Sequence, residues 1–362
     1  MRVLVLGAGT IGATIAGMLA GTDSYAVTLA DARPEALERI RRNDISLRVL
    51  DVEDRAALET ALAKQDAVVS ALPFFLNTGI AEAARAAEAH YFDLTEDVAT
   101  TAAVRAVAAD ARTAFVPQCG LAPGFVGIVA HALTRRFERV RAVRLRVGAL
   151  PRYTTNPLKY NLTWSTEGLI NEYCNPCEAI RHGKRTLVPP LQGLERFSFD
   201  GIDYEAFNTS GGLGTLTETL EGKVESLDYK TVRYPGHRDI MELLLDGLRL
   251  RERRELLVEL LQTALPTTAQ DVVLVFVSIV GTREGRLVEE TFARKIHGGE
   301  AGQTLSAIQQ TTAAGLCAMV ELLRRGHLPQ KGFVPQEAAD LGDFLATPFA
   351  EVFRSGSGAE FP

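Results

Sequence analysis

Three glycines near the start of the chain, Gly7, Gly9 and Gly12, are spaced as G-x-G-x-x-G. An apolar run precedes them and an alanine-rich helical pattern follows, so they lie between an expected strand and an expected helix. There Gly7 permits a tight turn, Gly9 lets the backbone approach a pyrophosphate, and Gly12 lets the helix pack against the strand. The first helical residues, Thr10 and Ile11, would offer N–H groups to the phosphates. We predict a dinucleotide site here, the alternative being a purely structural turn.

An aspartate closes the second apolar run of the chain. Asp31 lies nineteen residues after Gly12, where dinucleotide-binding domains place an acid. Its carboxylate would accept hydrogen bonds from the ribose hydroxyls and repel a 2′-phosphate, which favours NAD over NADP as the cofactor. Arg33 could cover an adenine face or hold that phosphate, so NADP stays the alternative.

The later apolar runs of the first 120 residues also end in residues that could reach a nucleotide. Ligands of parallel sheets bind beyond the carboxyl ends of the strands, where these residues would gather. The further predicted cofactor-binding residues are Asp51, Val52, Ala71, Leu72, Pro73, Asn77, Cys119 and Gly120. Asp93 ends another such run, and its carboxylate could act as a general base, orient an amine, or cap the segment that follows.

Two cations, a phenol and an imidazole occur together between Lys230 and His237. Arg233 would match a carboxylate with two parallel hydrogen bonds, which suits an amino-acid substrate. On a strand, Lys230 and Arg233 point to opposite faces, so at most one would face a given pocket. His237 precedes an expected helix and is the histidine that we favour as a site residue. The alternative interpretation of the segment is a salt-bridged strand end.

Two shorter patterns could also contribute to a site. The glycine-rich segment 208–216, with Thr209 and Ser210, could approach a ligand through its backbone, although it is more typical of an ordinary loop. Cys174 and Cys177 form a C-x-x-C pair, but a structural zinc would need a second close pair of ligands, so we predict no metal site. We interpret this pair as structural or incidental.

The order of these elements predicts an α/β fold with two domains. In residues 1–120 apolar runs alternate with helical patterns, one of them at 33–42, which is typical of a doubly wound parallel sheet, the Rossmann domain. Residues 121–300 contain alternating strand patterns, among them a hairpin at 271–297, and helices at about 238–250 and 252–264. They predict an α+β substrate and dimerisation domain with a mostly antiparallel sheet.

The remaining residues form the C-terminal part of the chain. We expect helices in 301–350 to return to the Rossmann domain and 351–362 to be disordered. Because antiparallel sheets with an exposed edge often pair, we expect a homodimer or higher homo-oligomer.

Composition limits the class of protein. The 362 residues carry a net charge of −6 and contain no basic run, so the sequence predicts no nucleic-acid partner. No apolar stretch is long enough to cross a membrane, and because the N-terminus runs directly into the first expected strand, we expect no signal peptide. Four cysteines do not make a disulfide framework in a chain of this length. We therefore expect a cytoplasmic protein with reduced thiols and a small-molecule substrate.

Several motifs along the chain match one known family. They begin with the glycine loop and continue through both expected domains. The matching stretches are 3–12, 70–73, 90–94, 119–124, 163–173, 207–213, 230–237 and 331–334. In these stretches the chain resembles the saccharopine dehydrogenase-like family, and within it the lysine 6-dehydrogenases.

The resemblance implies an NAD-dependent oxidoreductase that oxidises L-lysine at its ε-carbon. The imine would be hydrolysed to the 6-semialdehyde, which cyclises, and ammonia would be released. By the same resemblance Asp93 would orient the amine and Arg233 would bind the α-carboxylate. Further residues expected to shape the pocket are Trp164, Glu167, Thr209 and Ser210.

Two other functions remain open. The first is a saccharopine or carboxynorspermidine dehydrogenase or reductase, which acts on a secondary amine. Saccharopine has three carboxylates, and the matching motifs offer only Lys230 and Arg233 as obvious cations, which favours a smaller substrate. The second is a nucleotide-binding regulator without catalysis, which would not need the polar residues of the second domain.

Overall fold

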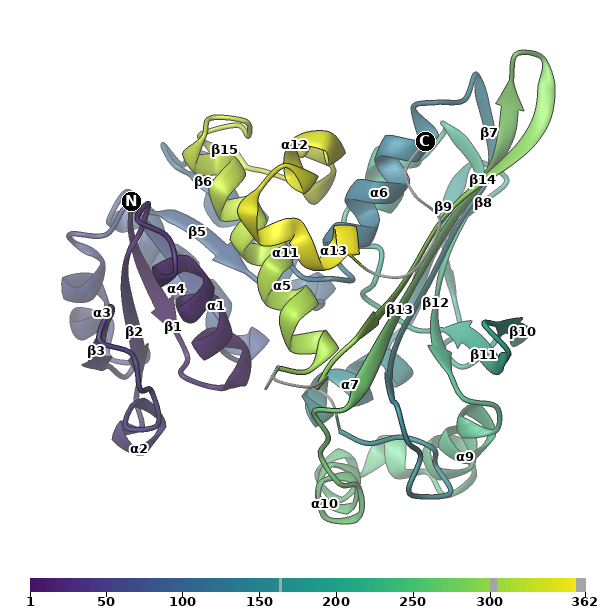
Figure 1. The fold of residues 1–362 in the computed structure, drawn as a ribbon, viewed down its shortest axis with the longest axis horizontal. Helices are drawn as coiled ribbons and strands as arrows, with labels where there is room; N and C mark the ends of the chain where they lie inside the picture. Colours follow the sequence, from purple (N-terminus) through teal and green to yellow (C-terminus); the bar gives the residue numbers. More distant parts are fainter. Residues whose placement is uncertain (163–164, 300–304, 356–362) are drawn as a thin grey trace. The chain divides into compact units, whose positions relative to one another are not determined.

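The chain forms two compact units (Figure 1). The computed structural model describes residues 1–162, 165–299 and 305–355. The first unit combines Met1–Ile128 with Gln309–Arg354, and the second consists of Val129–Ile308. No helix in the described residues is both long and apolar enough to span a membrane.

The first unit contains a parallel sheet. Among its described residues, seven strands pair in the order β15-β6-β5-β4-β1-β2-β3. Their bounds are β1 Arg2–Leu6, β2 Ala26–Asp31, β3 Ile45–Val49, β4 Ala67–Ser70, β5 His90–Asp93, β6 Ala114–Val116 and β15 Gly332–Phe333. Apart from β15 this is the strand order of a Rossmann domain, so the predicted fold class is confirmed for this unit.

Helices cover both faces of this sheet. On one face, helices α3–α5 bury their apolar side against alternate residues of β1, β4, β5 and β6, for example Leu4 and Tyr91. Helices α1 and α11 contact each other, since the thiol of Cys317 donates to the carbonyl oxygen of Ile15. The helices of this unit are α1 Thr10–Ala20, α2 Pro34–Leu37, α3 Arg55–Leu62, α4 Asn77–Ala86, α5 Val98–Ala108, α11 Ala307–Arg324, α12 Leu341–Leu345 and α13 Glu351–Ser355. Helix α6, Phe125–Thr134, begins in the first unit and ends in the second.

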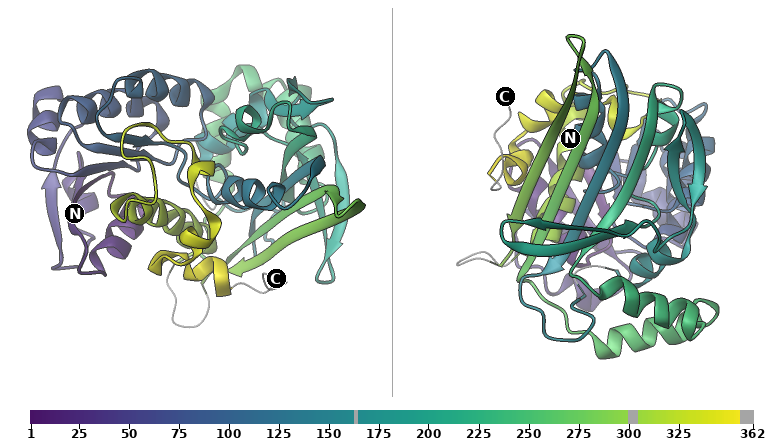
Figure 2. Two further views of the ribbon diagram at one scale, coloured as in Figure 1. Left: turned by 90° about the horizontal axis from the view of Figure 1, so that it is seen from above. Right: turned by 90° about the vertical axis from the view of Figure 1, so that its right-hand side faces the viewer.

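The second unit contains a mixed, largely antiparallel sheet, whose long strands lie side by side in the right-hand view of Figure 2. The order in the described residues is β10-β11-β12-β7-β13-β14, with β8 pairing to β12 and β9. Among the named strands of the described residues, only β7 and β12 pair in parallel. The strands are β7 Arg139–Pro151, β8 Cys177–Arg181, β9 Lys184–Val188, β10 Glu195–Phe199, β11 Ile202–Asn208, β12 Val224–Arg233, β13 Asp271–Arg283 and β14 Arg286–His297.

Helices pack on one face of this second sheet. Their bounds are α7 Thr166–Cys174, α8 Leu216–Leu220, α9 His237–Glu242 and α10 Arg254–Ala264. Residues of α7, α9 and α10, such as Tyr173, Met241 and Leu261, share a buried apolar cluster with Phe207 of β11. This cluster surrounds the buried arginine that is described below.

The structure differs from the predicted elements in several places. The helix predicted at 33–42 ends at Leu37, and Arg42 instead donates to the carbonyl oxygen of Gly17 and pairs with Asp44, which requires the chain to leave the helix. The helix predicted at 238–250 is regular only to Glu242, after which a π-helical turn follows.

Part of the C-terminal stretch that was expected to be disordered is ordered. Helix α13 forms because Phe353 is fully buried and stacks on Phe125 with ring centroids 3.9 Å apart. The rest of that stretch, residues 356–362, lies outside the described residues.

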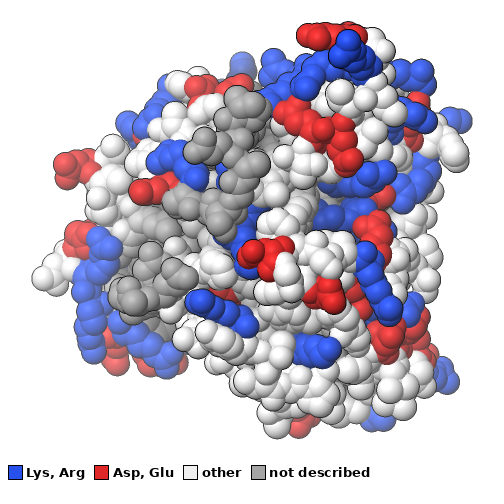
Figure 3. All heavy atoms as spheres, turned by 45° about the vertical axis from the view of Figure 1, so that its right-hand side comes forward, with Lys and Arg blue, Asp and Glu red and all other residues white. Residues whose placement is uncertain are grey.

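Charged side chains of both signs are interspersed over the face drawn in Figure 3. Exposed ion pairs of the described residues include Arg139 with Glu225 and Arg249 with Glu252. Pairs of this kind contribute little to stability, about 0–1 kcal/mol each.

Candidate functional site

The glycine loop of the first unit is packed as tightly as a phosphate-binding turn requires. A Cβ at Gly12 would lie 1.9 Å from the carbonyl oxygen of Gly7, and Gly7 itself has a φ of +100°. A Cβ at Gly9 would meet no atom within 4 Å. The fold therefore needs two of the glycines, whereas the third leaves open space beside the start of α1. Thr10 and Ile11 begin that helix, which no described side chain caps, so its first N–H groups fit a pyrophosphate.

Asp31 joins the glycine loop to the end of β2. Its carboxylate is buried and accepts hydrogen bonds from the N–H of Ala8 at 2.8 Å and from the N–H of Arg33 at 2.9 Å. Burial alone would raise the pKa of Asp31, but the hydrogen bonds from Arg33 and Ala8 hold it below its ordinary value. The side chain of Arg33 is 65% exposed and pairs with this carboxylate through Nε. An ionised acid and a neighbouring exposed cation therefore stand where a ribose would bind.

Other predicted cofactor residues lie beside the loop. The carbonyl oxygen of Ala71 and the side chain of Leu72 are the nearest atoms to a Cβ placed on Gly7. Leu50, which precedes Asp51 and Val52, donates its N–H to the carbonyl oxygen of Asp31. These contacts bring the ends of β1 to β4 together.

Two more predicted residues link the end of β4 to the next helix. Asn77 begins α4 and accepts a hydrogen bond from the hydroxyl of Ser70 at 2.7 Å, and both side chains are buried. Pro73 precedes the short 3₁₀ turn between them.

Asp93 is fully buried at the end of β5. One carboxylate oxygen accepts from the N–H groups of Thr95 (3.0 Å) and Gln118 (2.9 Å), and the other accepts from the hydroxyl of Tyr91 (2.8 Å). Burial raises the pKa of Asp93 to about 6. The bond from the Thr95 N–H caps the segment that follows β5, which is one of the roles that the sequence allowed for Asp93. The bond from the Gln118 N–H fixes the chain where it leaves β6. The catalytic role of Asp93 stays a prediction.

Cys119 and Gly120 follow this exit. The N–H of Cys119 donates to the carbonyl oxygen of Asp93 at 2.8 Å, and burial raises the pKa of its thiol well above the ordinary value. Gln336 donates to the Cys119 sulfur at 3.2 Å and to the carbonyl oxygen of Pro117. Gln336 was not predicted as a site residue, because nothing local in the sequence marks a residue that reaches this site from the C-terminal segment.

In the second unit, Arg233 is 2% exposed at the end of β12. Its Nε donates to the hydroxyl of Tyr173 at 2.9 Å, its Nη1 donates to the carbonyl oxygen of Val232, and its guanidinium lies 5.1 Å from the ring centre of Tyr160. No carboxylate among the described residues forms an ion pair with it. Burial alone would lower the pKa of Arg233, but Tyr173, Tyr160 and Glu172 raise it, so the group is charged.

His237 belongs to the same cluster. Its ring is fully buried, with Nε2 3.0 Å from the Tyr173 hydroxyl and Nδ1 2.9 Å from the carbonyl oxygen of Leu158. Burial and the charge of Arg233 lower the pKa of His237 to about 3. The imidazole is neutral at ordinary pH and is unsuited to serve as a proton donor. Tyr173 is a second residue that was not predicted from the sequence, because a tyrosine on an apolar helix face gives no local signal.

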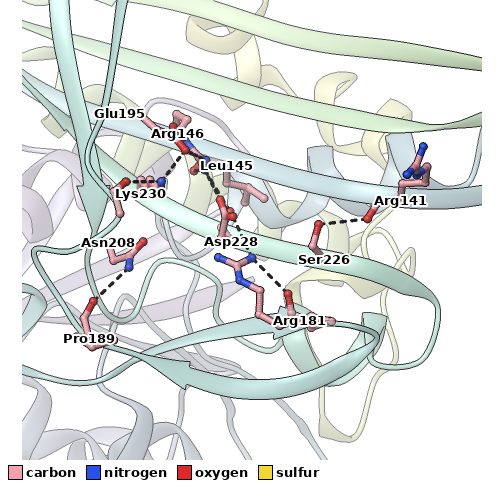
Figure 4. A network of polar contacts seen from close by, with 12 residues as sticks. Arg141, Leu145, Arg146, Arg181, Pro189, Glu195, Asn208, Ser226, Asp228 and Lys230 are labelled. Carbon is pink, nitrogen blue, oxygen red and sulfur yellow. Dashed lines mark hydrogen bonds and ion pairs between the residues drawn. The ribbon is translucent and has the colours of Figure 1, made fainter.

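Lys230 belongs to a different set of contacts, the ion-pair chain drawn in Figure 4. Its Nζ lies 2.5 Å from Glu195 Oε1, and Glu195 also accepts two hydrogen bonds from Arg146. Arg146 also forms an ion pair with Asp228, which in turn forms an ion pair with Arg181. Lys230 and Arg233 thus have separate partners, as side chains on opposite faces of β12 must.

The other predicted pocket residues differ in burial and in whether the structure describes them. Thr209 and Ser210 are buried, and the Thr209 hydroxyl has no partner in the described residues. Ser210 is tied to α7 by its N–H and its hydroxyl. Glu167 has an exposed side chain in the first turn of α7, and Trp164 lies outside the described residues.

The remaining motifs gave no site. Cys174 ends α7 and Cys177 begins β8, both thiols are free, and burial raises both pKa values. Among the described residues, no group of three or more His, Cys, Asp or Glu side chains could hold a metal ion.

The sheet order and the glycine loop define a dinucleotide-binding Rossmann unit, and the same chain contains an α+β unit with a buried arginine. Two family models match: the saccharopine dehydrogenase NADP binding domain over residues 3–116, and the saccharopine dehydrogenase C-terminal domain over residues 120–358. The chain therefore belongs to the saccharopine dehydrogenase family of oxidoreductases, and its first unit is a nicotinamide-nucleotide-binding domain.

Individual relatives are more distant. Saccharopine dehydrogenase [NADP(+), L-glutamate-forming] of Saccharomyces cerevisiae is 25% identical over 267 residues, which cover 69% of this chain and 59% of that protein. Alpha-aminoadipic semialdehyde synthase of Bos taurus is 26% identical over 193 residues, 51% of this chain and 21% of that protein. The chain thus spans between about a fifth and three-fifths of these two curated relatives.

Solved structures confirm the fold. The apo saccharopine dehydrogenase (L-Glu forming) of Saccharomyces cerevisiae superposes with a TM-score of 0.77 at 17% identity, over 95% of this chain and 96% of that one. The homospermidine synthase of Legionella pneumophila, solved in complex with NAD, has a TM-score of 0.64 at 13% identity, over 97% of this chain and 89% of that one. At these identities the likeness concerns the fold alone.

Proposed function

We propose that the protein catalyses the NAD-dependent oxidative deamination of L-lysine at its ε-carbon. The substrate would lose two electrons and two protons to become an imine, and water would then replace the nitrogen, giving the 6-semialdehyde and ammonia. NAD, when bound at the glycine loop, supplies the hydride acceptor. The aldehyde would cyclise with the α-amino group.

The observation that carries this proposal is the buried guanidinium of Arg233, which forms no ion pair with a carboxylate among the described residues. A guanidinium has five N–H donors, and the described residues accept from two of them. A substrate carboxylate would satisfy the remaining donors with a bidentate pair, so this site suits an amino acid.

The number of such cations favours a substrate with one carboxylate. Lys230, the second cation of the motif, is already neutralised by Glu195 at 2.5 Å. Arg146, on the same sheet, shares that carboxylate. Lysine needs one cationic partner, whereas the three carboxylates of saccharopine would need more than Arg233.

The amine must be neutral before it can expel hydride, because its lone pair forms the imine. An unperturbed ε-ammonium has a pKa of about 10.4, so the enzyme has to favour its deprotonation. We assign Asp93 to orienting this amine. Its three hydrogen bonds and its burial would hold the carboxylate rigidly.

The choice of NAD rests on Asp31. Its carboxylate is ionised and held at the end of β2, so it would accept from the ribose hydroxyls and repel a 2′-phosphate. The exposed guanidinium of Arg33 would then lie against the adenine, and NADP is the alternative in which it binds the phosphate.

A second candidate is saccharopine dehydrogenation, which the 25% identity to a fungal enzyme of that name supports. Reduction of NAD with L-lysine, measured beside saccharopine at mildly alkaline pH, tests both. Turnover of lysine with release of ammonia supports the proposal. Turnover of saccharopine alone replaces it with the second candidate, and inactivity with both contradicts both.

We also propose that the protein works in the cytoplasm as a homodimer. All four cysteines are free thiols, which suits a reducing compartment. Strand β14 pairs only with β13 among the described strands and leaves an edge that a second copy could cover. Light scattering of the purified protein measures the oligomeric state directly.

A further inference from the structure

Three buried polar side chains form one hydrogen-bonded chain in the second unit. Arg233 Nε lies 2.9 Å from the Tyr173 hydroxyl, which lies 3.0 Å from His237 Nε2. His237 Nδ1 in turn lies 2.9 Å from the carbonyl oxygen of Leu158. The three side chains are at most 2% exposed, so water does not compete for these bonds.

The donors and acceptors of this chain can be arranged in only one direction. The carbonyl oxygen of Leu158 can only accept, so the proton of the neutral imidazole is on Nδ1. Nε2 is then an acceptor, and the hydroxyl of Tyr173 donates to it. The same hydroxyl oxygen accepts from Arg233 Nε, which can only donate.

Aromatic rings hold the chain in place from its sides. The ring of Phe207 is nearly parallel to that of His237, at an angle of 11° and a centroid distance of 6.3 Å, and Tyr160 meets His237 edge-on at 5.4 Å. Tyr160 also lies under the guanidinium of Arg233. None of the three polar side chains can rotate without breaking a bond of the chain and displacing one of these rings.

We infer that Tyr173 and His237 are positioning residues that fix the guanidinium of Arg233, so that its remaining N–H groups are preset to receive a substrate carboxylate. This inference rests on the proposed role of Arg233 in substrate binding. A preset guanidinium loses less conformational freedom when the carboxylate binds, so the effect should appear in substrate affinity.

The first test is Tyr173→Phe, which removes the hydroxyl and keeps the ring. We expect the KM for L-lysine to rise about tenfold, equivalent to about 1.4 kcal/mol, while kcat changes by less than about twofold. The Ki of pentane-1,5-diamine as a competitor of lysine should not change, because this diamine has no carboxylate. Tyr204→Phe is the matched control, since Tyr204, on β11 of the same unit, is as deeply buried as Tyr173 and its hydroxyl has no partner in the described residues.

The second test is His237→Ala, alone and combined with Tyr173→Phe. Because both side chains act through the same bond to Arg233, the double variant should raise the KM no further than Tyr173→Phe does. Equal effects on lysine and on the diamine would show that the substitutions only perturb packing, and would overturn the inference. An unchanged KM in Tyr173→Phe would do the same.

A third measurement needs neither a variant nor turnover. In the ¹⁵N-histidine-labelled wild type, the resonances of His237 should report a neutral ring protonated on Nδ1 from pH 5 to pH 8. A His237 that titrates near pH 6.5, or one protonated on Nε2, contradicts the proposed direction of the hydrogen bonds between His237, Tyr173 and Arg233. If the wild type oxidises neither lysine nor saccharopine, the proposed function fails. The spectrum still decides whether the hydrogen bonds between His237, Tyr173 and Arg233 are formed.

Discussion

The Cβ that an alanine would place at position 12 lies 1.9 Å from the carbonyl oxygen of Gly7. This approach exists because helix α1 starts directly over the end of β1, which also brings its first N–H groups to the carboxyl edge of the sheet. Gly9, three residues earlier, has free space where its side chain would be. The three glycines of one motif therefore have different tasks, and substitutions can separate them.

Gly9→Ala should weaken nucleotide binding and leave the fold intact, because the added methyl group occupies space that only a ligand would use. We expect the Kd of NAD to rise about tenfold or more, with a Tm close to that of the wild type. Gly12→Ala should instead lower the free energy of unfolding by about 1–3 kcal/mol or more, since backbone must move. Calorimetry of both variants measures the two effects, and equal nucleotide affinity in Gly9→Ala and the wild type would contradict a phosphate site at this loop.

Asp31→Asn should reduce the preference for NAD over NADP. Asparagine can still accept from the N–H of Ala8, so the loop stays tied to β2, but the charge that repels a 2′-phosphate is lost. We expect the ratio of kcat/KM for NAD to that for NADP to fall about tenfold. Arg33→Ala is the companion variant: if it abolishes activity with NADP in an enzyme that prefers NADP, then Arg33 binds the phosphate and the choice of NAD is wrong.

The parts of the fold that could be predicted from the sequence are those that local patterns encode. The glycine loop, Asp31 and the β13–β14 hairpin are each marked by residues close together in the chain, and all three are in the predicted place. Strand β15 has two residues and exists because Gly332 and Phe333 pair with β6, more than two hundred positions earlier. Such pairing leaves no periodic signal.

The residues around Arg233 likewise include some that local sequence marks and one contact that only the packing of the fold creates. Arg233 and His237 were singled out because they stand close together in the sequence. Their connection through Tyr173 depends on α7 packing against β12, and no pattern in the sequence reports that contact. The separation of Lys230 from Arg233 could be predicted, because it follows from the alternation of a strand alone.

Asp93 should make stability depend on pH between about 4 and 6. Burial raises its pKa to about 6 in the folded protein, above the ordinary value of about 3.9 for an unfolded chain. The folded state therefore binds this proton more tightly, so the contribution of Asp93 to the free energy of unfolding is full below pH ~4 and is lost as the pH rises through 6. Urea denaturation should show that the wild type loses ~3 kcal/mol relative to Asp93→Asn over this range. A constant difference between the two proteins would contradict the raised pKa.

The same variant, Asp93→Asn, distinguishes a catalytic role of Asp93 from a purely structural one. Asparagine can accept from the N–H groups of Thr95 and Gln118 and donate to Tyr91, so a purely structural role survives the substitution. If the carboxylate orients or deprotonates the amine, kcat should fall about 100-fold or more while the Kd of NAD stays the same. Steady-state kinetics at saturating lysine measures this, and full kcat in Asp93→Asn would assign the residue to the fold alone.

Lys230 and Arg233 lie on the same strand, but their substitutions should affect different properties. Substitution of Lys230 should lower stability, whereas substitution of Arg233 should weaken substrate binding. Lys230→Met removes a partner of Glu195, which is 43% exposed and keeps its bonds to Arg146, so we expect a loss of about 1–2 kcal/mol of stability and an unchanged KM for lysine. Arg233→Lys keeps a positive charge but loses the planar fork that holds a carboxylate, so the KM should rise about tenfold or more. Melting temperatures and KM values for the two variants test this pairing of roles. A raised KM in Lys230→Met with unchanged stability would mean that Lys230 binds substrate, and the argument for a substrate with a single carboxylate would then fail.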